Sequence, residues 1–171
     1  RGDVVALQLP NTPDFLLGYL AIARLGAVTC TLHMPYRGAE IATLMAHGGA
    51  KLAICLPPAK EMFEGRGIAF SELDTGKKFE EQGTPRPADP FLLLYTSGTT
   101  AAPKGVVHPY RTMLGNARLG APEHRLTEYD RILCAAPLSH LYGLYSLHCA
   151  WAVGACTVLL PQFSPPELAE T

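Results

Sequence analysis

The residues best suited to chemistry lie in one short run, 95–105, with the sequence YTSGTTAAPKG. The run holds three threonines, one serine, two glycines and one lysine, and it directly follows the apolar residues 91–94. Glycine lets a backbone approach an anion closely, and successive backbone N–H groups can form an anion nest. Hydroxyl groups add donors and lysine adds positive charge. The run therefore predicts a phosphate-binding loop that opens from a buried strand.

The spacing differs from that of the Walker A loop. That motif requires Gly-Lys followed by Ser or Thr at the start of a helix. Here Lys104 follows Pro103 and precedes Gly105, and two valines continue as a strand. Because Pro103 disfavours a helical conformation at the residue before it, we expect a strand–loop–strand clamp rather than a polar hairpin turn. The residues expected to hold phosphate are Thr96, Ser97, Gly98, Thr99, Thr100, Lys104 and Gly105.

A second candidate run is 136–144, with the sequence APLSHLYGL, in which Ser139 and His140 are adjacent. Neighbouring residues rarely form a nucleophile–base pair, and no G-x-S-x-G motif surrounds Ser139 or Ser97. No base lies beside Thr96 or Ser97 in the sequence, so a covalent role for either is also disfavoured. These patterns argue against a hydrolase.

Composition excludes other classes of function. The 171 residues carry a net charge of −1, and 17% are charged, against ~25% in an average soluble protein. This balance gives no case for nucleic acid or for an acidic membrane surface. No apolar run approaches the ~20 residues of a membrane span, and no signal peptide is visible. We therefore expect a cytoplasmic protein.

Cysteine and histidine patterns do not indicate a metal site. The five cysteines show no C-x-x-C spacing, and the six histidines form no H-E-x-x-H motif. We expect the cysteines to be reduced core residues and no zinc to be bound. His148 is expected to be structural.

Alternating elements predict the fold class. Strands are expected over 4–9, 27–32, 51–56, 91–95, 105–108, 131–136 and 156–160, with helices over 13–25, 38–47, 110–119 and 141–153. Thr12 is expected to cap the first helix, with Pro13 as its first residue. Met113, Leu114 and Ala117 are expected to face inward from the third helix. Strands that alternate with helices indicate an α/β fold, with a mostly parallel sheet flanked by helices.

Two stretches differ from this pattern. Residues 57–90 are punctuated by Pro and Gly, and we expect irregular connections with a short strand and a helical turn. The run from Ser164 to Glu167 has the spacing of a capping box, yet only four residues follow it. A helix of that length is unstable by itself. We expect residues 1–171 to be part of a larger protein, with the remainder of its own polypeptide as a partner.

The loop 95–105 resembles the signature loop of the adenylate-forming enzymes, which include acyl-CoA synthetases and peptide-synthetase adenylation domains. Residues 136–144 are similar to the next motif of this family, and residues 2–11 and 26–28 match its early segments, in the right order. Ala101 stands where the family usually has glycine. The resemblance implies that 1–171 is an incomplete part of the large N-terminal, AMP-binding domain, without the rest of that domain or the mobile C-terminal domain.

The resemblance also implies a reaction. A carboxylic acid is activated by ATP as an acyl-adenylate and then transferred to coenzyme A, with Mg²⁺ as the metal that accompanies ATP. Lys104 would neutralise the phosphates, and His140 would lie beside the carboxylate. The residues around His140 include no acid of the kind that amino-acid-activating domains carry, which favours a fatty, alicyclic or aryl acid over a peptide-synthetase substrate. The alternative is a non-catalytic module that binds phosphate or nucleotide, or that packs against a partner.

Overall fold

The structure is a computed structural model that describes residues 1–73, 84–96 and 103–161. Within these ranges the elements, in chain order, are β1 (Val4–Gln8), α1 (Pro13–Arg24), β2 (Val28–Thr31), α2 (Gly38–Gly48), β3 (Ala50–Cys55), the 3-10 turn η1 (Pro57–Phe63), β4 (Gly67–Ala69), the 3-10 turn η2 (Phe70–Glu72), β5 (Pro90–Thr96), β6 (Lys104–Pro109), α3 (Tyr110–Glu123), β7 (Arg131–Cys134), α4 (Leu141–Val153) and β8 (Cys156–Leu159). The expected Ser164–Glu167 cap lies outside the described residues.

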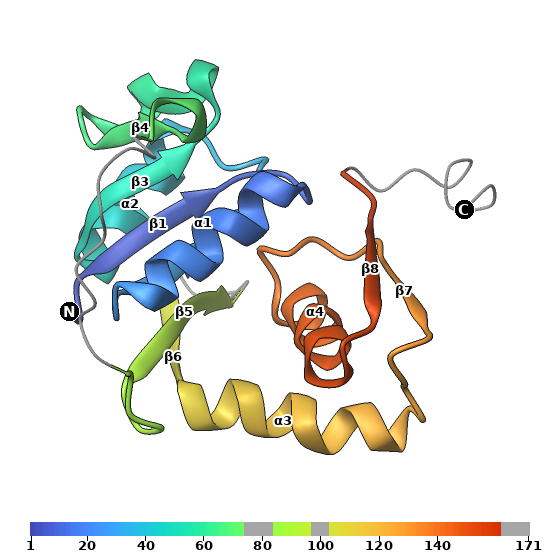
Figure 1. The fold of residues 1–171 in the computed structure, drawn as a ribbon. Helices are drawn as coiled ribbons and strands as arrows, with labels where there is room; N and C mark the ends of the chain where they lie inside the picture. Colours follow the sequence, from blue (N-terminus) through green and yellow to red (C-terminus); the bar gives the residue numbers. More distant parts are fainter. Residues whose placement is uncertain (74–83, 97–102, 162–171) are drawn as a thin grey trace.

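A six-stranded sheet forms the centre of the fold, with the order β4-β3-β1-β2-β5-β6 (Figure 1). Its neighbouring strands pair in parallel, except that β6 runs antiparallel to β5 at one edge. The predicted fold class, a mostly parallel sheet flanked by helices, is confirmed. A second, two-stranded parallel sheet consists of β7 and β8, which the sequence did not separate from the first.

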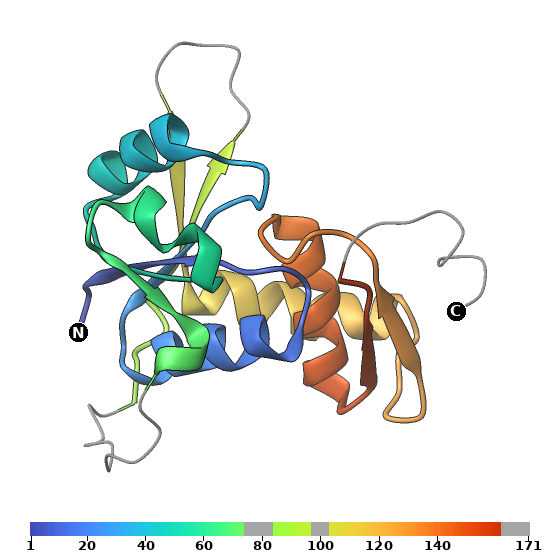
Figure 2. The same cartoon turned by 90° about the horizontal axis from the view of Figure 1, so that it is seen from above.

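Both faces of the large sheet are covered by helices, and each face has its own core. Figure 2 shows α1 on one side of the strands and α2 on the other. Leu92 and Leu94 of β5 belong to the core on the α1 side, whereas Leu93 belongs to the core on the α2 side. Successive side chains of a strand point to opposite faces, so a strand buried on both faces is apolar throughout. This explains the uninterrupted apolar run before the signature loop.

The order of the strands creates a crevice between β1 and β2. The chain passes from β1 through α1 to β2 beside it, and then returns through α2 to β3 on the other side of β1. The connections after β1 and β2 therefore leave toward opposite faces of the sheet. In open α/β sheets, ligands bind at such a switch point, outside the carboxyl ends of the strands.

The elements that follow β6, from residue 110 to 161, pack against this sheet. Helix α3 follows β6 directly and packs along α4, and the two-stranded sheet lies on the far side of α4 (Figure 1). The buried residues of α3 are Met113, Ala117, Gly120 and Ala121. The expectation that Leu114 faces inward was wrong, because its side chain is 41% exposed.

Other local expectations had mixed outcomes. Residues 57–72 form two 3-10 turns and a short strand, as expected. Thr12 occupies the residue before α1, but its hydroxyl donates to the carbonyl of Pro10 instead of capping the helix. All five cysteines are free thiols; four are buried and Cys156 is exposed. None of the helices in the described ranges combines the length and hydropathy that crossing a bilayer requires.

Candidate functional site

The described flanks of the signature loop form an antiparallel hairpin. Thr96, the last residue of β5, is the register partner of Lys104, the first residue of β6. Both residues are exposed, so the hydroxyl and the ammonium group stand opposite each other where the chain enters and leaves the loop. Ser97, Gly98, Thr99 and Thr100 lie outside the described residues. Their expected contacts with phosphate therefore stay predictions.

Gly105 occupies a closely packed position at the base of this hairpin. A Cβ at this position would lie 2.9 Å from Cδ1 of Leu93 and 3.3 Å from Cε1 of Tyr95. The ring of Tyr95 is itself held against α2, because its hydroxyl bonds Nδ1 of His47 at 3.0 Å and donates to the carbonyl of Leu44 at 3.3 Å. Gly105 thus lets β6 lie close to the anchored tyrosine, which positions Lys104 beside the loop.

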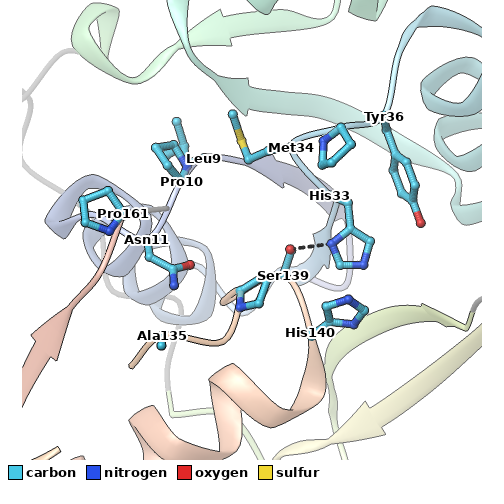
Figure 3. Close-up of a pocket in the computed structure, with 12 residues that line it drawn as sticks. Leu9, Pro10, Asn11, His33, Met34, Tyr36, Ala135, Ser139, His140 and Pro161 are labelled. Atoms are coloured by element: carbon cyan, nitrogen blue, oxygen red, sulfur yellow. Dashed lines mark hydrogen bonds between the residues drawn. The ribbon is translucent and has the colours of Figure 1, made fainter. Parts of the chain in front are cut away.

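A cavity of about 430 Å³ lies at the crevice between β1 and β2 (Figure 3). Its walls come from three segments, which follow β1, follow β2 and connect β7 to α4. Pro161, after β8, closes one side. The lining residues are Leu9, Pro10, Asn11, His33, Met34, Pro35, Tyr36, Ala135, Pro137, Ser139, His140 and Pro161. Because β2 and β5 are parallel neighbours, their carboxyl ends lie at the same edge of the sheet. The cavity and the start of the signature loop are therefore both at that edge.

Asn11 fastens the wall formed by the segment before α4. Its buried side-chain amide donates to the carbonyl of Ala136 at 2.9 Å and more weakly to that of Cys134 at 3.4 Å, while its Oδ1 accepts from the backbone N–H of Leu138 at 2.8 Å. A second fastening comes from β2, where the hydroxyl of Thr31 donates to the carbonyl of Ser139 at 2.9 Å. These bonds hold residues 136–139 against the sheet edge.

His140 stands directly before α4, in an extended conformation with φ −107° and ψ 153°. Its side chain makes no capping bond and is exposed on the wall of the cavity. Its backbone N–H donates to the carbonyl of Pro137 at 2.9 Å. The backbone is therefore fixed, while the imidazole is exposed to the cavity. The expected place of His140 beside the carboxylate stays a prediction.

His33 is a site residue that sequence reasoning missed. Its Nδ1 lies 2.7 Å from Oγ of Ser139, and its ring centroid lies 3.9 Å from that of His140 (Figure 3). Burial and the nearby His140 lower the pKa of His33. One signal was present in the sequence, since His33 is the polar residue that follows β2 just as Asn11 follows β1.

A second, more open cavity of about 310 Å³ lies between α3 and α4. It is lined by Met113, Asn116, Leu141, Tyr142 and Tyr145. Leu141 and Tyr142 follow His140 in the chain, and both are exposed. An apolar and aromatic surface thus begins one residue from the candidate carboxylate ligand.

The described residues do not fit a protein-held Mg²⁺. The lining of the cavity at the crevice contains no carboxylate, although carboxylates and water are the usual ligands of this ion. Within the described ranges no three His, Cys, Asp or Glu side chains gather as a metal-ligand set. Mg²⁺ accordingly has no assigned ligand in this site.

His148, expected to be structural, is a buried residue of α4. Its Nε2 is 3.2 Å from the hydroxyl of Tyr19, and its ring stacks on Phe91 with centroids 5.9 Å apart. Only 3% of the residue is exposed. The structure confirms that it is remote from the cavity surface.

Comparisons with known proteins identify the family of this chain. The chain belongs to the AMP-binding enzyme family, whose model matches residues 1–171. A 4-coumarate–CoA ligase of Humulus lupulus is 31% identical over 99% of this chain and 36% of its own length. The long-chain-fatty-acid–CoA ligase FadD13 of Mycobacterium tuberculosis is 26% identical over 98% of this chain and 37% of its own length.

Solved structures give the same result for the fold. The o-succinylbenzoate coenzyme A synthetase MenE of Bacillus subtilis, in complex with AMP, superposes with a TM-score of 0.92 at 27% identity. The match covers 99% of this chain and 46% of that protein. The two sequence relatives named above are CoA ligases. This chain spans little more than a third of the length of each.

Proposed function

We propose that the polypeptide containing residues 1–171 is an ATP-dependent acid–CoA ligase. In the first step, a carboxylate oxygen attacks the α-phosphorus of ATP, the bond to the β-phosphate breaks, and pyrophosphate leaves. In the second step, the sulfur of coenzyme A attacks the acyl carbon and AMP leaves. The observation that carries the proposal is that β5, which leads into the signature loop at Thr96, ends at the same edge of the sheet as the cavity lined by His140.

The loop would bind the phosphates and stabilise the charge that moves onto pyrophosphate. Thr96, Ser97, Gly98, Thr99 and Thr100 supply hydroxyl and backbone donors, and Lys104 supplies a positive charge opposite Thr96. Hydrogen bonds to charged groups each contribute roughly 1.5–3 kcal/mol. Gly105 supports this arrangement through packing.

His140 would hold the carboxylate, and the cavity between α3 and α4 would receive the acyl chain. Leu141 and the two tyrosines that line this second cavity suit an apolar acid of medium size. Fatty, alicyclic and aryl acids all meet that description. An amino acid is disfavoured, because the described lining of either cavity offers no acidic partner for an α-amino group.

We also propose that residues 1–171 alone do not complete the reaction. The described cavities hold the residues that we propose for the carboxylate and the acyl chain, but no residue is assigned to adenine, ribose or coenzyme A. The longer relatives support this division. Carboxylate-dependent exchange between ATP and pyrophosphate, catalysed by residues 1–171 alone, would contradict it.

The test is ATP–pyrophosphate exchange by the full-length polypeptide, with a panel of hydroxycinnamic, fatty, alicyclic and amino acids. Lys104→Ala is expected to lower the exchange rate about 10- to 1000-fold, by analogy with the loss of one preorganised donor. Lys51→Ala is the matched control, since Lys51 is an exposed lysine that pairs with Asp3 at the opposite edge of the sheet. An active enzyme in which Lys104→Ala stays within twofold of the wild type would refute the role of Lys104.

A further inference from the structure

His33 holds a central place in the cavity, although neither the motifs nor the comparisons assign it a role. It leaves the carboxyl end of β2 and contacts residues of the β7–α4 segment more than 100 positions away in the sequence. Its ring contacts both the hydroxyl of Ser139 and the imidazole of His140 (Figure 3).

Ser139 gives the ring of His33 a fixed partner. The carbonyl of Ser139 accepts the hydroxyl of Thr31, and Ser139 is only 8% exposed. With this backbone fastened, the 2.7 Å contact between Oγ of Ser139 and Nδ1 of His33 fixes the orientation of the ring. The ring of Tyr36 packs against it in a T-shaped arrangement, with ring centroids 5.2 Å apart.

His140 has no such fastening of its own. Its imidazole is exposed and makes no capping hydrogen bond, and its contact among the described residues is the packing on His33. Ring centroids at 3.9 Å with an interplanar angle of 49° place the two rings in close, tilted contact. Removing His33 would therefore leave the catalytic candidate free to adopt other rotamers.

Charge in the cavity is also set by this pair. Two imidazoles at this distance repel when both are protonated, because like charges disfavour the charged form of each other. Few other titratable or charged groups lie near His33. The pKa of Tyr36 is raised by burial and by the charge of Glu40. The guanidinium of Arg37 donates to the carbonyls of Met34 and Tyr36. The segment after β1 contributes no titratable group to the lining. A proton on His33 is therefore disfavoured both by the burial of its ring and by the neighbouring imidazole, which lower its pKa.

We propose that His33 is a positioning residue for the carboxylate substrate, which acts by holding the imidazole of His140 on the wall of the cavity. The inference rests on the proposed ligase function. It assigns Ser139 to the support of His33 and not to nucleophilic attack. The described residues place no carboxylate against His33 that would orient it as a base.

The test is a double-mutant cycle in the full-length enzyme, measured by carboxylate-dependent ATP–pyrophosphate exchange. His33→Ala is expected to lower kcat/KM for the carboxylate about 10- to 100-fold, since a displacement of about 1 Å at a reacting group costs about 100-fold. The KM for ATP should change less than twofold. His33→Ala combined with His140→Ala should be no slower than His140→Ala alone, because His33 acts through His140.

Conservative and control variants separate positioning from folding. His33→Asn keeps a polar group near Oγ of Ser139 and should recover part of the loss, whereas His33→Phe keeps a ring but loses that bond. His108→Ala is the control, since His108 is also half-buried with a pKa lowered by burial but lies outside the cavity. Independent, multiplicative losses from His33→Ala and His140→Ala would overturn the proposal, as would an acyl group found on Ser139 by mass spectrometry.

A measurement that does not depend on catalysis distinguishes failure of the ligase proposal from failure of the proposed role of His33. If the wild-type enzyme shows no carboxylate-dependent exchange, the ligase function fails. The contact can then still be measured by an NMR titration of the imidazoles: His140→Ala should raise the pKa of His33, because it removes a neighbouring charge and part of the burial. An unchanged pKa of His33 would overturn the coupling of the two rings.

Discussion

Protonation of His148 should couple the stability of this protein to pH. The imidazole lies among Tyr19, Phe91 and Trp151, with ring centroids 5.7, 5.9 and 5.6 Å away. One of its nitrogens contacts the hydroxyl of Tyr19, and the buried Nδ1 has no hydrogen-bond partner among the described residues. Desolvation therefore lowers the pKa of His148 from 6.5 to about 4.

The size of the effect follows from this difference. In the unfolded chain His148 takes up a proton as the pH falls through 6.5, whereas in the folded chain it does so only near pH 4. Between these values the unfolded state binds more protons, so stability falls as the pH falls. Each pKa unit corresponds to about 1.4 kcal/mol, so His148 should account for a loss of about 3 kcal/mol between pH 7.5 and pH 4.

Trp151 provides the assay. It is the single tryptophan of the 171 residues and packs against His148 within α4. Urea unfolding followed by its fluorescence at pH 7.5, 6, 5 and 4 gives the free energy of unfolding of the wild type and of His148→Phe. The phenylalanine keeps a ring beside Phe91 but cannot titrate, and losing the bond to Tyr19 should cost about 1 kcal/mol at every pH.

The difference in the free energy of unfolding between the wild type and His148→Phe isolates the contribution of His148 from that of other titrating groups. The stability of His148→Phe relative to the wild type should rise by about 3 kcal/mol as the pH falls from 7.5 to 4. Equal pH dependence of the two proteins would refute the reasoning, as would an NMR titration that places the pKa of His148 at 6 or above.

Three further outcomes follow from packing. Asn11→Ala removes a buried side chain that makes three hydrogen bonds across the site; it should lower the free energy of unfolding by about 2–4 kcal/mol, measured by urea unfolding, and a loss below 1 kcal/mol would contradict this role. Gly143→Ala would bring a Cβ within van der Waals overlap of the backbone carbonyl of Pro137; it should displace the segment before α4 and lower both the melting temperature and carboxylate-dependent exchange, and an unchanged enzyme would show that the packing there is looser. Cys156 is the exposed thiol among five free cysteines; a thiol reagent should modify about one cysteine rapidly in the native chain and all five in denaturant, and rapid modification of several would contradict the burial of the others.

Elements whose stability rests on local pattern were predictable from sequence. Helix α4 begins at Leu141 and ends at Val153, as expected, because Gly154 adopts a left-handed conformation with φ 77° that terminates it. The apolar run 91–94 indicated a buried strand, and β5 is buried on both faces of the sheet. Such features depend on neighbours a few positions away.

Contacts between distant segments were not predictable in the same way. Ser139 was weighed as the partner of His140 beside it, whereas its hydroxyl bonds His33, 106 positions away. The separate sheet of β7 and β8 was missed because an apolar strand has the same pattern in either sheet. Leu114 was misplaced because the side of α3 that contacts α4 is defined by Met113, Ala117, Gly120 and Ala121, and a helical step of one residue turns Leu114 away from it.

The central claim is that the carboxylate substrate attacks the α-phosphorus of ATP at this site. The most direct measurement is the transfer of ¹⁸O from a labelled carboxylic acid during thioester formation by the full-length enzyme, with the products analysed by mass spectrometry. The account predicts one ¹⁸O atom in each AMP released and none in pyrophosphate, because the attacking oxygen stays on the α-phosphorus when coenzyme A displaces AMP. Unlabelled AMP in the presence of thioester product would contradict it.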